Sequence, residues 1–381
     1  MSQAAVSKVL NDGYGLSDAM RAKVEAAMEA LGYRPSAMAR GMRGRGYTLG
    51  VFLVDLRNTF FSVLIDGIRD TAEAQGYQVF IGQARSGLDA QRRLIEAMVD
   101  RRMDGLVLIA PFGPAEWLEE VGRTTPTVVL VRHGPGRNYD TVASDDIAGS
   151  GHIVDHLVSL GHRRIAHLKH LGDEKNQPGM PQEVRAQGYI EAMVRNGLQD
   201  DIDVIEARWS REGGQRAAEL ILDYPQAPTA IHAGSDMPAL GAMEDFSRAN
   251  WSVPGDISIV GYDNIPMSSM HPLSLTTIDQ AGTEMGSLAA TLLLERIKGR
   301  TWPVSTLVTP RLVLRSTTAP PPAHGTAGAD RQKELGASLN EGTPPPSPEG
   351  IINRIPWKRT PSTSRADELP PVVSDRCIRR R

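Results

Sequence analysis

Residues 48–84 read TLGVFLVDLRNTFFSVLIDGIRDTAEAQGYQVFIGQA and contain one complete strand–helix–strand unit. The apolar run at 48–55 predicts a buried strand, and the segment at 60–76 has the spacing of an amphipathic helix that ends at Gly76. A second apolar run at 77–84 predicts the next strand. Two strands joined by a helix are parallel, and units of this kind build doubly wound sheets that helices cover on both faces.

The same alternation of strand and helix continues toward the carboxyl terminus. Strands are predicted at 105–111 and 126–132 with a helix before each, and the pattern starts again after Ser144-Asp145. Two runs of similar size predict two α/β lobes within residues 48–318. Ligands of such sheets bind at the carboxyl ends of the strands, so the cleft between the lobes is the expected binding site.

The composition excludes several classes of protein. The 381 residues carry 42 Lys and Arg against 45 Asp and Glu, a formal net charge of −3, so the whole chain is not a nucleic-acid-binding polycation. The single cysteine, Cys377, excludes an internal disulfide and favours a reducing compartment. No apolar run is long enough to cross a membrane and no signal peptide opens the chain, which predicts a cytoplasmic protein without a membrane partner.

The two ends of the chain differ from the body. Residues 319–381 are rich in Pro, Gly and Ser and have few apolar residues and no periodicity, which predicts disorder. The first 47 residues are locally basic, with seven Lys and Arg against four Asp and Glu. There SQAAVSKVLN, at 2–11, predicts a short helix, and a second helix is predicted from Ser17-Asp18. The second helix carries an apolar stripe that we expect to be buried, formed by Val24, Ala27, Met28 and Leu31.

These segments, together with YRPSAMARGMRGRG at 33–46, resemble the LacI/GalR family of bacterial transcriptional repressors from the recognition helix onward. The resemblance covers residues 2–318 and implies the fold class. We expect a two-lobed, periplasmic-binding-protein-like α/β effector domain of parallel doubly wound sheets, preceded by a small, partial all-α helix-turn-helix headpiece. The implied domains are a headpiece at 1–34, a hinge helix or linker at 35–47, an effector-binding and dimerisation domain at 48–318 and a tail at 319–381.

The resemblance begins one helix late. In the family about 15 residues come first and form the helix that braces the recognition helix, and Met1-Ser2 stands where that segment ends in Val-Ser. We favour a misassigned start codon over a truncated paralogue that binds DNA weakly. The absence of upstream codons for such a helix would rule that interpretation out.

The resemblance also implies which residues of the recognition helix contact DNA. Gln3, Ala4 and Lys8 fall at the positions that read bases in the family. Glutamine is suited to adenine, lysine to guanine and alanine to the thymine methyl group. Ser7 and Asn11 are expected to contact phosphate or to cap the helix. The alternative is that this polar face is simply solvated.

The hinge segment is expected to meet the minor groove. Met42 stands where the family has a leucine that wedges between base pairs, and methionine is among the side chains that serve as such wedges. Arg40 supplies positive charge for the DNA backbone. The alternative is a flexible basic linker.

Several residues are implied as effector contacts. Arg185 opens the Arg-x-x-Gly motif whose arginine holds ligand hydroxyls or a carboxylate, and Asp263 in VGYDN matches an aspartate that accepts hydrogen bonds from a sugar. Trp209 is placed to stack on a ring-shaped ligand. The full predicted set is Asp55, Phe60, Phe61, Asp145, Arg185, Trp209, Ser235, Asp236 and Asp263.

Three members of that set have a purely structural alternative. Asp145 and Asp236 each stand at a predicted helix start, where a carboxylate commonly caps the helix. Ser235 replaces the sugar-binding Asn of many relatives and could cap the same helix. The chain also has LRNTFF at 56–61 where LxNPFF is usual, and loss of that proline should relax the turn.

No motif indicates catalysis. Five histidines lie between residues 152 and 170, but no acidic or cysteine partner has ligand spacing, so we expect no metal. A nucleophile elbow, a P-loop and a dinucleotide fingerprint are missing from the sequence, so we expect neither an enzyme nor a cofactor.

The sequence therefore predicts a sequence-specific repressor whose operator affinity responds to a small-molecule effector, a sugar or nucleoside. A homodimer is expected because the tail lacks the leucine-heptad helix with which some family members form tetramers. Two alternatives stay open: an effector-binding sensor that has lost DNA binding, and a transporter-type sugar-binding protein. The second would need export.

Overall fold

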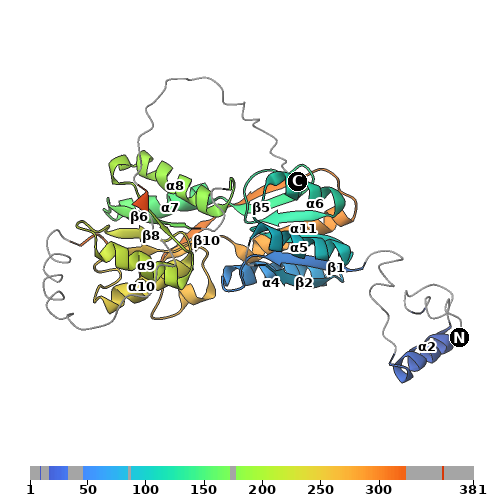
Figure 1. Ribbon diagram of the computed structural model, residues 1–381. Coiled ribbons are helices and arrows are strands. Elements are labelled where there is room, and N and C mark those ends of the chain that lie inside the picture. The colour runs from blue at the N-terminus through green and yellow to red at the C-terminus, as the bar shows by residue number, and fades with distance from the viewer. Residues whose placement is uncertain are drawn as a thin grey trace, which may run out of the picture.

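A computed structural model describes residues 9, 17–32, 46–84, 87–171, 177–322 and 354–355 of the chain. Two α/β lobes lie side by side, and helix α2 (Asp18–Ala30) lies apart from both (Figure 1). The predicted DNA contacts lie outside the described residues; they are Gln3, Ala4, Ser7, Lys8, Asn11, Arg40 and Met42.

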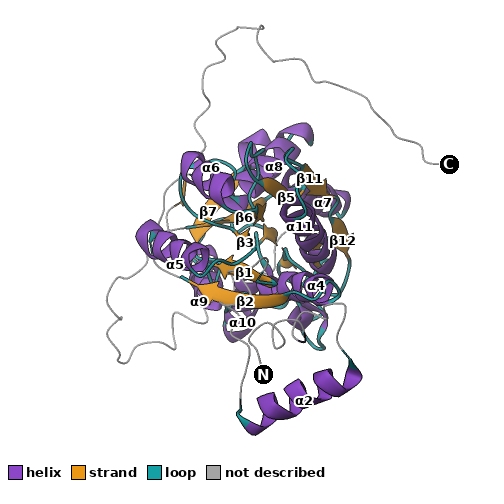
Figure 2. Cartoon of the chain, turned by 90° about the vertical axis from the view of Figure 1, so that its right-hand side faces the viewer, coloured by secondary structure: helices purple, strands orange, loops and turns teal. Residues whose placement is uncertain are grey.

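The first lobe is built on a six-stranded parallel sheet in the order β11-β5-β4-β3-β1-β2. The predicted strands are present, and helices cover both faces (Figure 2). Its strands are β1 (Thr48–Leu53), β2 (Gln78–Gln83), β3 (Gly105–Ile109), β4 (Thr127–Leu130), β5 (Asp140–Ser144) and β11 (Ser305–Val308). Its helices are α4 (Phe60–Glu73), α5 (Leu88–Asp100), α6 (Ala115–Thr124) and α11 (Gly282–Ile297).

Strand β1 shows why this sheet is buried on both faces. Val51 and Leu53 pack with the apolar residues of α4 and α11, while Phe52 between them packs on the other face with α5 and α6. Successive side chains of a strand point to opposite faces, so a continuous apolar run supplies both cores.

Helices α4 and α11 cross at glycines. A Cβ atom on Gly67 would lie 2.1 Å from the carbonyl oxygen of Thr283, and one on Gly286 would lie 2.1 Å from that of Leu64. The two backbones are therefore in direct contact, which any larger residue would prevent. This crossing holds α11, late in the sequence, on the first lobe.

The second lobe has a sheet in the order β13-β7-β6-β8-β9, in which only β13 is antiparallel to its neighbour. Its strands are β6 (Ile165–His170), β7 (Asp203–Ala207), β8 (Ala230–His232), β9 (Ser258–Val260) and β13 (Arg354–Ile355). Its helices are α7 (Asp146–Ser159), α8 (Pro181–Arg195), α9 (Arg211–Leu222), α10 (Asp236–Arg248) and the short 3₁₀ turns η1 (Gln199–Asp201) and η2 (Pro266–Ser269).

Within the described ranges the chain crosses between the lobes three times: from β5 to α7, from β10 (Thr277–Asp279) to α11, and from β11 to β12 (Arg311–Val313). Strands β10 and β12 pair with each other in antiparallel fashion. The expectation of two successive runs therefore needs a correction, because residues 282–308 return to the first lobe. The apolar side of α11, including Met285 and Leu293, completes that lobe's core.

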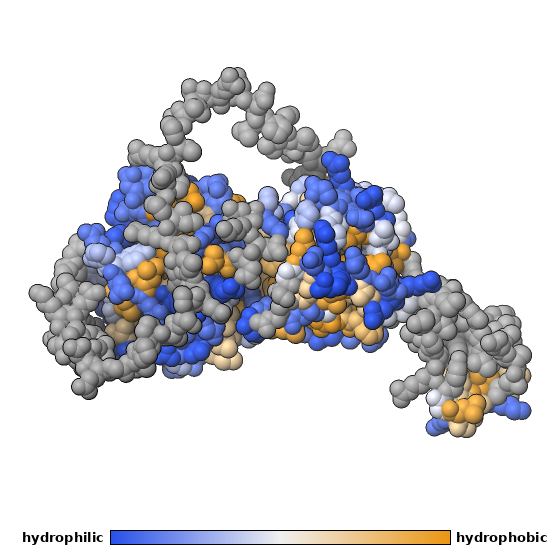
Figure 3. Space-filling view, viewed as in Figure 1, coloured by the Kyte–Doolittle hydropathy of each residue, from blue (hydrophilic) through white to orange (hydrophobic). Residues whose placement is uncertain are grey.

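The described ends of the chain differ from expectation in two places. Helix α2 begins at the predicted Ser17-Asp18, with Ser17 as its cap, and Val24 is buried, but Leu31 at the end of the predicted stripe is 81 % exposed. Hydrophobic residues accordingly remain on the visible surface around α2 (Figure 3). In the predicted tail, the carbonyl oxygen of Ala319 lies 2.8 Å from Nε2 of His162, and β13 pairs with β7.

A buried aromatic cluster fills the second lobe beneath its sheet ends. His167 is fully buried, stacks on Tyr189 at 5.2 Å and meets the edge of His232 at 4.4 Å. Burial lowers the pKa of His167 to about 3, because the imidazolium would lose its hydration there. This histidine is consequently packed as a neutral ring.

The variant His167→Phe should make the protein less sensitive to acid. Unfolded histidine titrates near pH 6.5, whereas folded His167 stays neutral down to about pH 3, so its burial costs stability as the pH falls below 6.5. Between pH 7 and pH 5 the parent should lose about 2 kcal/mol more than the variant, since only the unfolded parent gains that proton. Urea unfolding at both pH values measures this. Equal losses in the two proteins would contradict the assignment.

Candidate functional site

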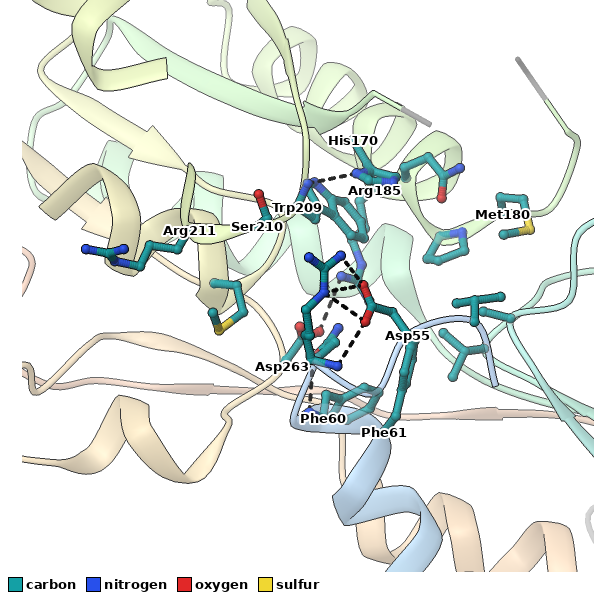
Figure 4. Close-up of a pocket in the computed structure, with 18 of the residues that line it drawn as sticks. Asp55, Phe60, Phe61, His170, Met180, Arg185, Trp209, Ser210, Arg211 and Asp263 are labelled. Atoms are coloured by element: carbon teal, nitrogen blue, oxygen red, sulfur yellow. Dashed lines mark hydrogen bonds and ion pairs between the residues drawn. The ribbon is translucent and has the colours of Figure 1, made fainter. Parts of the chain in front are cut away.

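A cavity of about 310 Å³ lies between the lobes, where the carboxyl ends of their strands meet. Figure 4 shows Asp55, Phe60 and Phe61 of the first lobe on one side, with Trp209 and Arg185 of the second lobe above them. The first-lobe lining is Val54, Asp55, Arg57, Asn58, Phe60, Phe61, Ala110, Phe112 and Val131. The second-lobe lining is His170, Met180, Pro181, Gln182, Arg185, Trp209, Ser210, Arg211, Glu212, Met237 and Asp263.

The structure brings six of the nine predicted effector residues to this cavity. They are Asp55, Phe60, Phe61, Arg185, Trp209 and Asp263. Asp145, Ser235 and Asp236 do not line it. The effector contacts of all nine stay predictions, but the three that lie outside the cavity have other partners in the protein.

Arg185 on α8 is the centre of the polar network. Its side chain is only 2 % exposed and its Nε donates to Oδ1 of Asp146 at 2.9 Å. One terminal nitrogen donates to the carbonyl oxygen of Gly234 at 2.7 Å and the other to Oε1 of Gln280 at 3.2 Å. The guanidinium thus donates mainly to acceptors within the protein, and only a small part of it is exposed to the cavity.

Asp146 is the functional neighbour that sequence analysis missed. Its second oxygen lies 2.7 Å from Nε2 of His133, which belongs to the first lobe. Burial alone would raise the pKa of Asp146, but the charge of Arg185 and the hydrogen bond from His133 outweigh it and the net pKa is lowered. The adjacent acidic pair in SDD was the available signal, and the pattern could not say which carboxylate faces inward.

Asp263 presents the other carboxylate to Arg185, at 3.4 Å from its terminal nitrogen. Ser235 Oγ donates to Asp263 Oδ2 at 2.7 Å, and Gln280 Nε2 donates to Oδ1 at 2.6 Å. Burial raises the pKa of Asp263 to about 6, although the charge of Arg185 opposes that rise. The residue is held with φ at +116°, a strained backbone for a non-glycine residue.

Asp236 lies behind this carboxylate, in the interior of the lobe. It accepts hydrogen bonds from Thr277 Oγ1 at 2.5 Å, Ser268 Oγ at 2.7 Å and the backbone N–H of Ile265 at 2.8 Å. Burial, with the nearby charge of Asp263, raises the pKa of Asp236 to about 7. Its role in the structure is to hold the loop that carries Asp263.

The capping alternatives have different outcomes. Asp145 caps α7, because its Oδ1 accepts a hydrogen bond from the backbone N–H of Ala148 at 3.0 Å. Ser235 stands at the cap position of α10 but makes no capping hydrogen bond; its hydroxyl serves Asp263 instead. The alternative that Ser235 caps the helix is therefore wrong.

Trp209 is held rigidly at the roof of the cavity. Its backbone N–H donates to Nδ1 of His170 at 2.8 Å, and its indole N–H donates to the carbonyl oxygen of Leu168 at 3.3 Å. The Arg185 guanidinium lies 5.0 Å from the centre of the Trp209 ring and 3.8 Å from that of Tyr262. A flat ring in the cavity would meet an indole that is already oriented.

The first lobe contributes an apolar wall and a compact polar turn. Phe60 and Phe61 begin α4, and Oδ1 of Asn58 accepts the backbone N–H of Phe60 at 3.0 Å. This hydrogen bond orders the turn that lacks the usual proline. Arg57 in the same turn pairs with Asp55, with 2.7 Å between its terminal nitrogen and Oδ2.

Two negative findings apply to the part of the chain that the structure describes. No group of three or more His, Cys, Asp or Glu residues there is arranged to hold a metal ion. No helix there is both long and apolar enough to pass through a bilayer.

Comparison with known proteins gives matches to both halves of this architecture. Residues 1–36 match the model described as "Bacterial regulatory proteins, lacI family", and residues 154–318 match "Periplasmic binding protein-like domain". The HTH-type transcriptional repressor CytR of Escherichia coli K12 is 34 % identical over 304 residues, 79 % of this chain and 87 % of CytR. The ribose operon repressor of the same strain is 31 % identical, over 78 % of this chain and 90 % of its own length.

Solved structures agree. A lac repressor dimer bound to operator and the anti-inducer ONPF has a TM-score of 0.71 at 27 % identity, covering 84 % of this chain and 96 % of its own. A regulator from Enterococcus faecium with bound ribose has a TM-score of 0.64 at 30 % identity, covering 72 % of this chain and 99 % of its own.

Replacement of Arg185 by methionine should be strongly destabilising. The variant Arg185→Met leaves Asp146 and Asp263 buried without their cation, and breaking such a pair costs about 3–5 kcal/mol. The matched control is Arg195→Met, because Arg195 pairs with Asp155 at 2.9 Å with both side chains about half exposed. That exposed pair should contribute less than about 1 kcal/mol. Urea unfolding measures both, and similar losses would contradict the central role of Arg185.

Proposed function

We propose, from the premise that this chain belongs to the lacI family of bacterial regulatory proteins, that its interlobe cavity binds a sugar- or nucleoside-like effector. The chain is a DNA-binding transcriptional regulator of the repressor type. Effector binding in the cavity would set its affinity for operator DNA.

The observation that carries this proposal is the composition of the cavity wall. Trp209 offers an oriented aromatic face, and Asp263 offers a carboxylate at the end of a strand. Aromatic faces stack on rings, and carboxylates accept hydrogen bonds from hydroxyl groups. A ring that bears hydroxyl groups satisfies both.

The mechanism follows from the three crossings between the lobes. An effector that contacts both walls favours one relative position of the lobes, and the crossings permit them to rotate without unfolding either sheet. In a homodimer that rotation would change the spacing of the two hinge segments at 35–47, and with it the affinity for DNA. Couplings of this kind are typically about 1–3 kcal/mol.

The partners follow from the same premise. The lac repressor that this chain resembles is described as a dimer bound to operator, and we propose a homodimer that binds near-palindromic operators. Gln3, Ala4, Ser7, Lys8 and Asn11 are the proposed contacts of the recognition helix. Arg40 and Met42 are those of the hinge. We further propose that the protein acts in the cytoplasm and catalyses no reaction.

A selection from random duplex DNA tests the DNA-binding half of the proposal. This chain and a version with a bracing helix fused before residue 1 are each used to enrich 30-bp duplexes. At least one should select a near-palindromic sequence, with binding that weakens steeply as salt rises because lysine and arginine release counterions from DNA. If neither chain enriches any sequence, the sensor that has lost DNA binding becomes the better description.

The variant Trp209→Ala tests the effector half. Ribose, adenosine, cytidine and uridine are titrated into the selected protein–DNA complex, and at least one should change operator affinity about 5- to 150-fold. Trp209→Ala should bind the operator as the parent does and lose that response, because the stacking surface is gone. Arg195→Met, which removes an exposed ion pair outside the cavity lining, should keep it. A response that survives Trp209→Ala would place the effector elsewhere.

A further inference from the structure

We propose that the cavity accepts uncharged effectors only, and that Asp55 excludes phosphorylated ones by engaging Arg57. This inference rests on the proposed function, because it names the chemical class of the ligand in the same cavity. Sugars and nucleosides have no net charge, whereas their phosphate esters are negatively charged. The charge balance of the cavity wall supports this assignment.

Among the residues that the structure describes, the charges on the cavity wall cancel. Three described arginines line it, at positions 57, 185 and 211, and three described carboxylates line it, at positions 55, 212 and 263. A site that selects a phosphate group normally presents guanidinium or ammonium groups that lack a protein carboxylate. Here each of the three arginines has one.

Arg57 is the cation most open to a ligand, with 66 % of its side chain exposed. Asp55 nevertheless engages it through several hydrogen bonds: Nε lies 3.1 Å from both carboxylate oxygens, and the terminal nitrogen lies 2.7 Å from Oδ2. The backbone N–H of Arg57 also donates to Oδ1 at 2.9 Å. The guanidinium N–H groups that would bind a phosphate therefore already donate to Asp55, a carboxylate of the same turn.

A second carboxylate faces the same arginine from the other lobe. The charge of Glu212, at the start of α9, adds to the effect of Asp55 in raising the pKa of Arg57. In turn Arg57 helps to lower the pKa of Glu212. An incoming phosphate would therefore meet the negative charge of Glu212 as well as that of Asp55.

The amino end of α9 is equally unsuited to binding a phosphate in place of Arg57. Helix N-termini commonly bind phosphate through free N–H groups, but here the Ser210 hydroxyl accepts the N–H of Gly213 at 3.1 Å. Glu212 supplies a negative charge to the first turn and bonds its own backbone N–H. Arg211 is turned to Glu244, with two 2.6 Å hydrogen bonds.

The deeper part of the cavity is equally unsuited to an anion. Arg185 is compensated by Asp146 and Asp263, and Asp263 itself faces the cavity. The remaining wall is largely aromatic and aliphatic, with Phe60, Phe61 and Phe112 opposite Trp209. An uncharged ring fits this wall without leaving any ionic group unpaired.

The test uses inorganic phosphate as the probe and thermal unfolding of the full chain as the readout, at pH 7.5 and constant ionic strength. Phosphate should raise the melting temperature of the parent no more than chloride does. In Asp55→Asn, which frees Arg57, about 50 mM phosphate should raise it by about 2–4 °C, because a ligand that binds only the folded state stabilises it. The double variant Asp55→Asn, Arg57→Gln should lose that gain, which places the phosphate at Arg57 rather than at the basic amino-terminal segment.

Two results would overturn the proposal. One is a phosphate-dependent stabilisation of the parent that Arg57→Gln abolishes, which would reveal a working anion site. The other is the absence of any gain in Asp55→Asn, which would show that Asp55 is not the excluding residue. Neither readout involves operator DNA. A failure of the proposed regulatory function therefore appears in the DNA experiments and a failure of this inference appears here.

Discussion

The buried guanidinium of Arg185 is the interaction on which the rest of the site depends. It joins the start of α7 through Asp146, the loop after β8 through Gly234 and the ends of β9 and β10 through Asp263 and Gln280. The first of these segments follows one lobe crossing directly and the last precedes another. A change at the cavity wall would reach, through this ionic group, the segments about which we propose that the lobes rotate. Because two carboxylates are buried beside it, this group cannot leave without a large cost in stability.

Local pattern predicted the elements well where a strand is a short apolar run, as in β1 and β3, and where a helix has one apolar side, as in α4. Strands β1 to β4 and helices α4 to α6 lie where the apolar runs and helical spacing predict them, and the alternation resumes with α7 directly after Ser144-Asp145. The pattern did not predict that α11 and β11 return to the first lobe. Nothing in the periodicity of 282–308 specifies which sheet it will cover. That choice depends on the close approach of Gly67 to the backbone of Thr283 and of Gly286 to that of Leu64, which are more than 200 positions apart. Leu31 shows a second limit of the pattern. It belongs to an apolar stripe but is exposed, because such a stripe is buried only where a partner surface exists.

Within the site, the sequence predicted which residue types are present, but it did not predict the direction in which each side chain points. Of the neighbours Asp145 and Asp146, the first caps a helix and the second holds Arg185, yet both are aspartates at the same helix start. Similarly, Ser235 occupies a cap position while its hydroxyl turns to Asp263. One residue of difference along a helix start rotates a side chain by roughly 100°, which decides whether it meets solvent, backbone or the cavity. Sequence spacing alone does not fix that angle.

The return of the chain to the first lobe has a consequence for biosynthesis. The six-stranded sheet cannot receive its edge strand β11 until residue 308 has left the ribosome, by which time the described strands β6 to β9 of the second lobe have already been made. The first lobe to begin is therefore completed only after strands β6 to β9 of the second lobe have been made, and until then it exposes the apolar surface that α11 will cover. Nascent chains arrested before this point should be the forms that chaperones hold. Neither lobe can be produced separately by simple truncation of the gene.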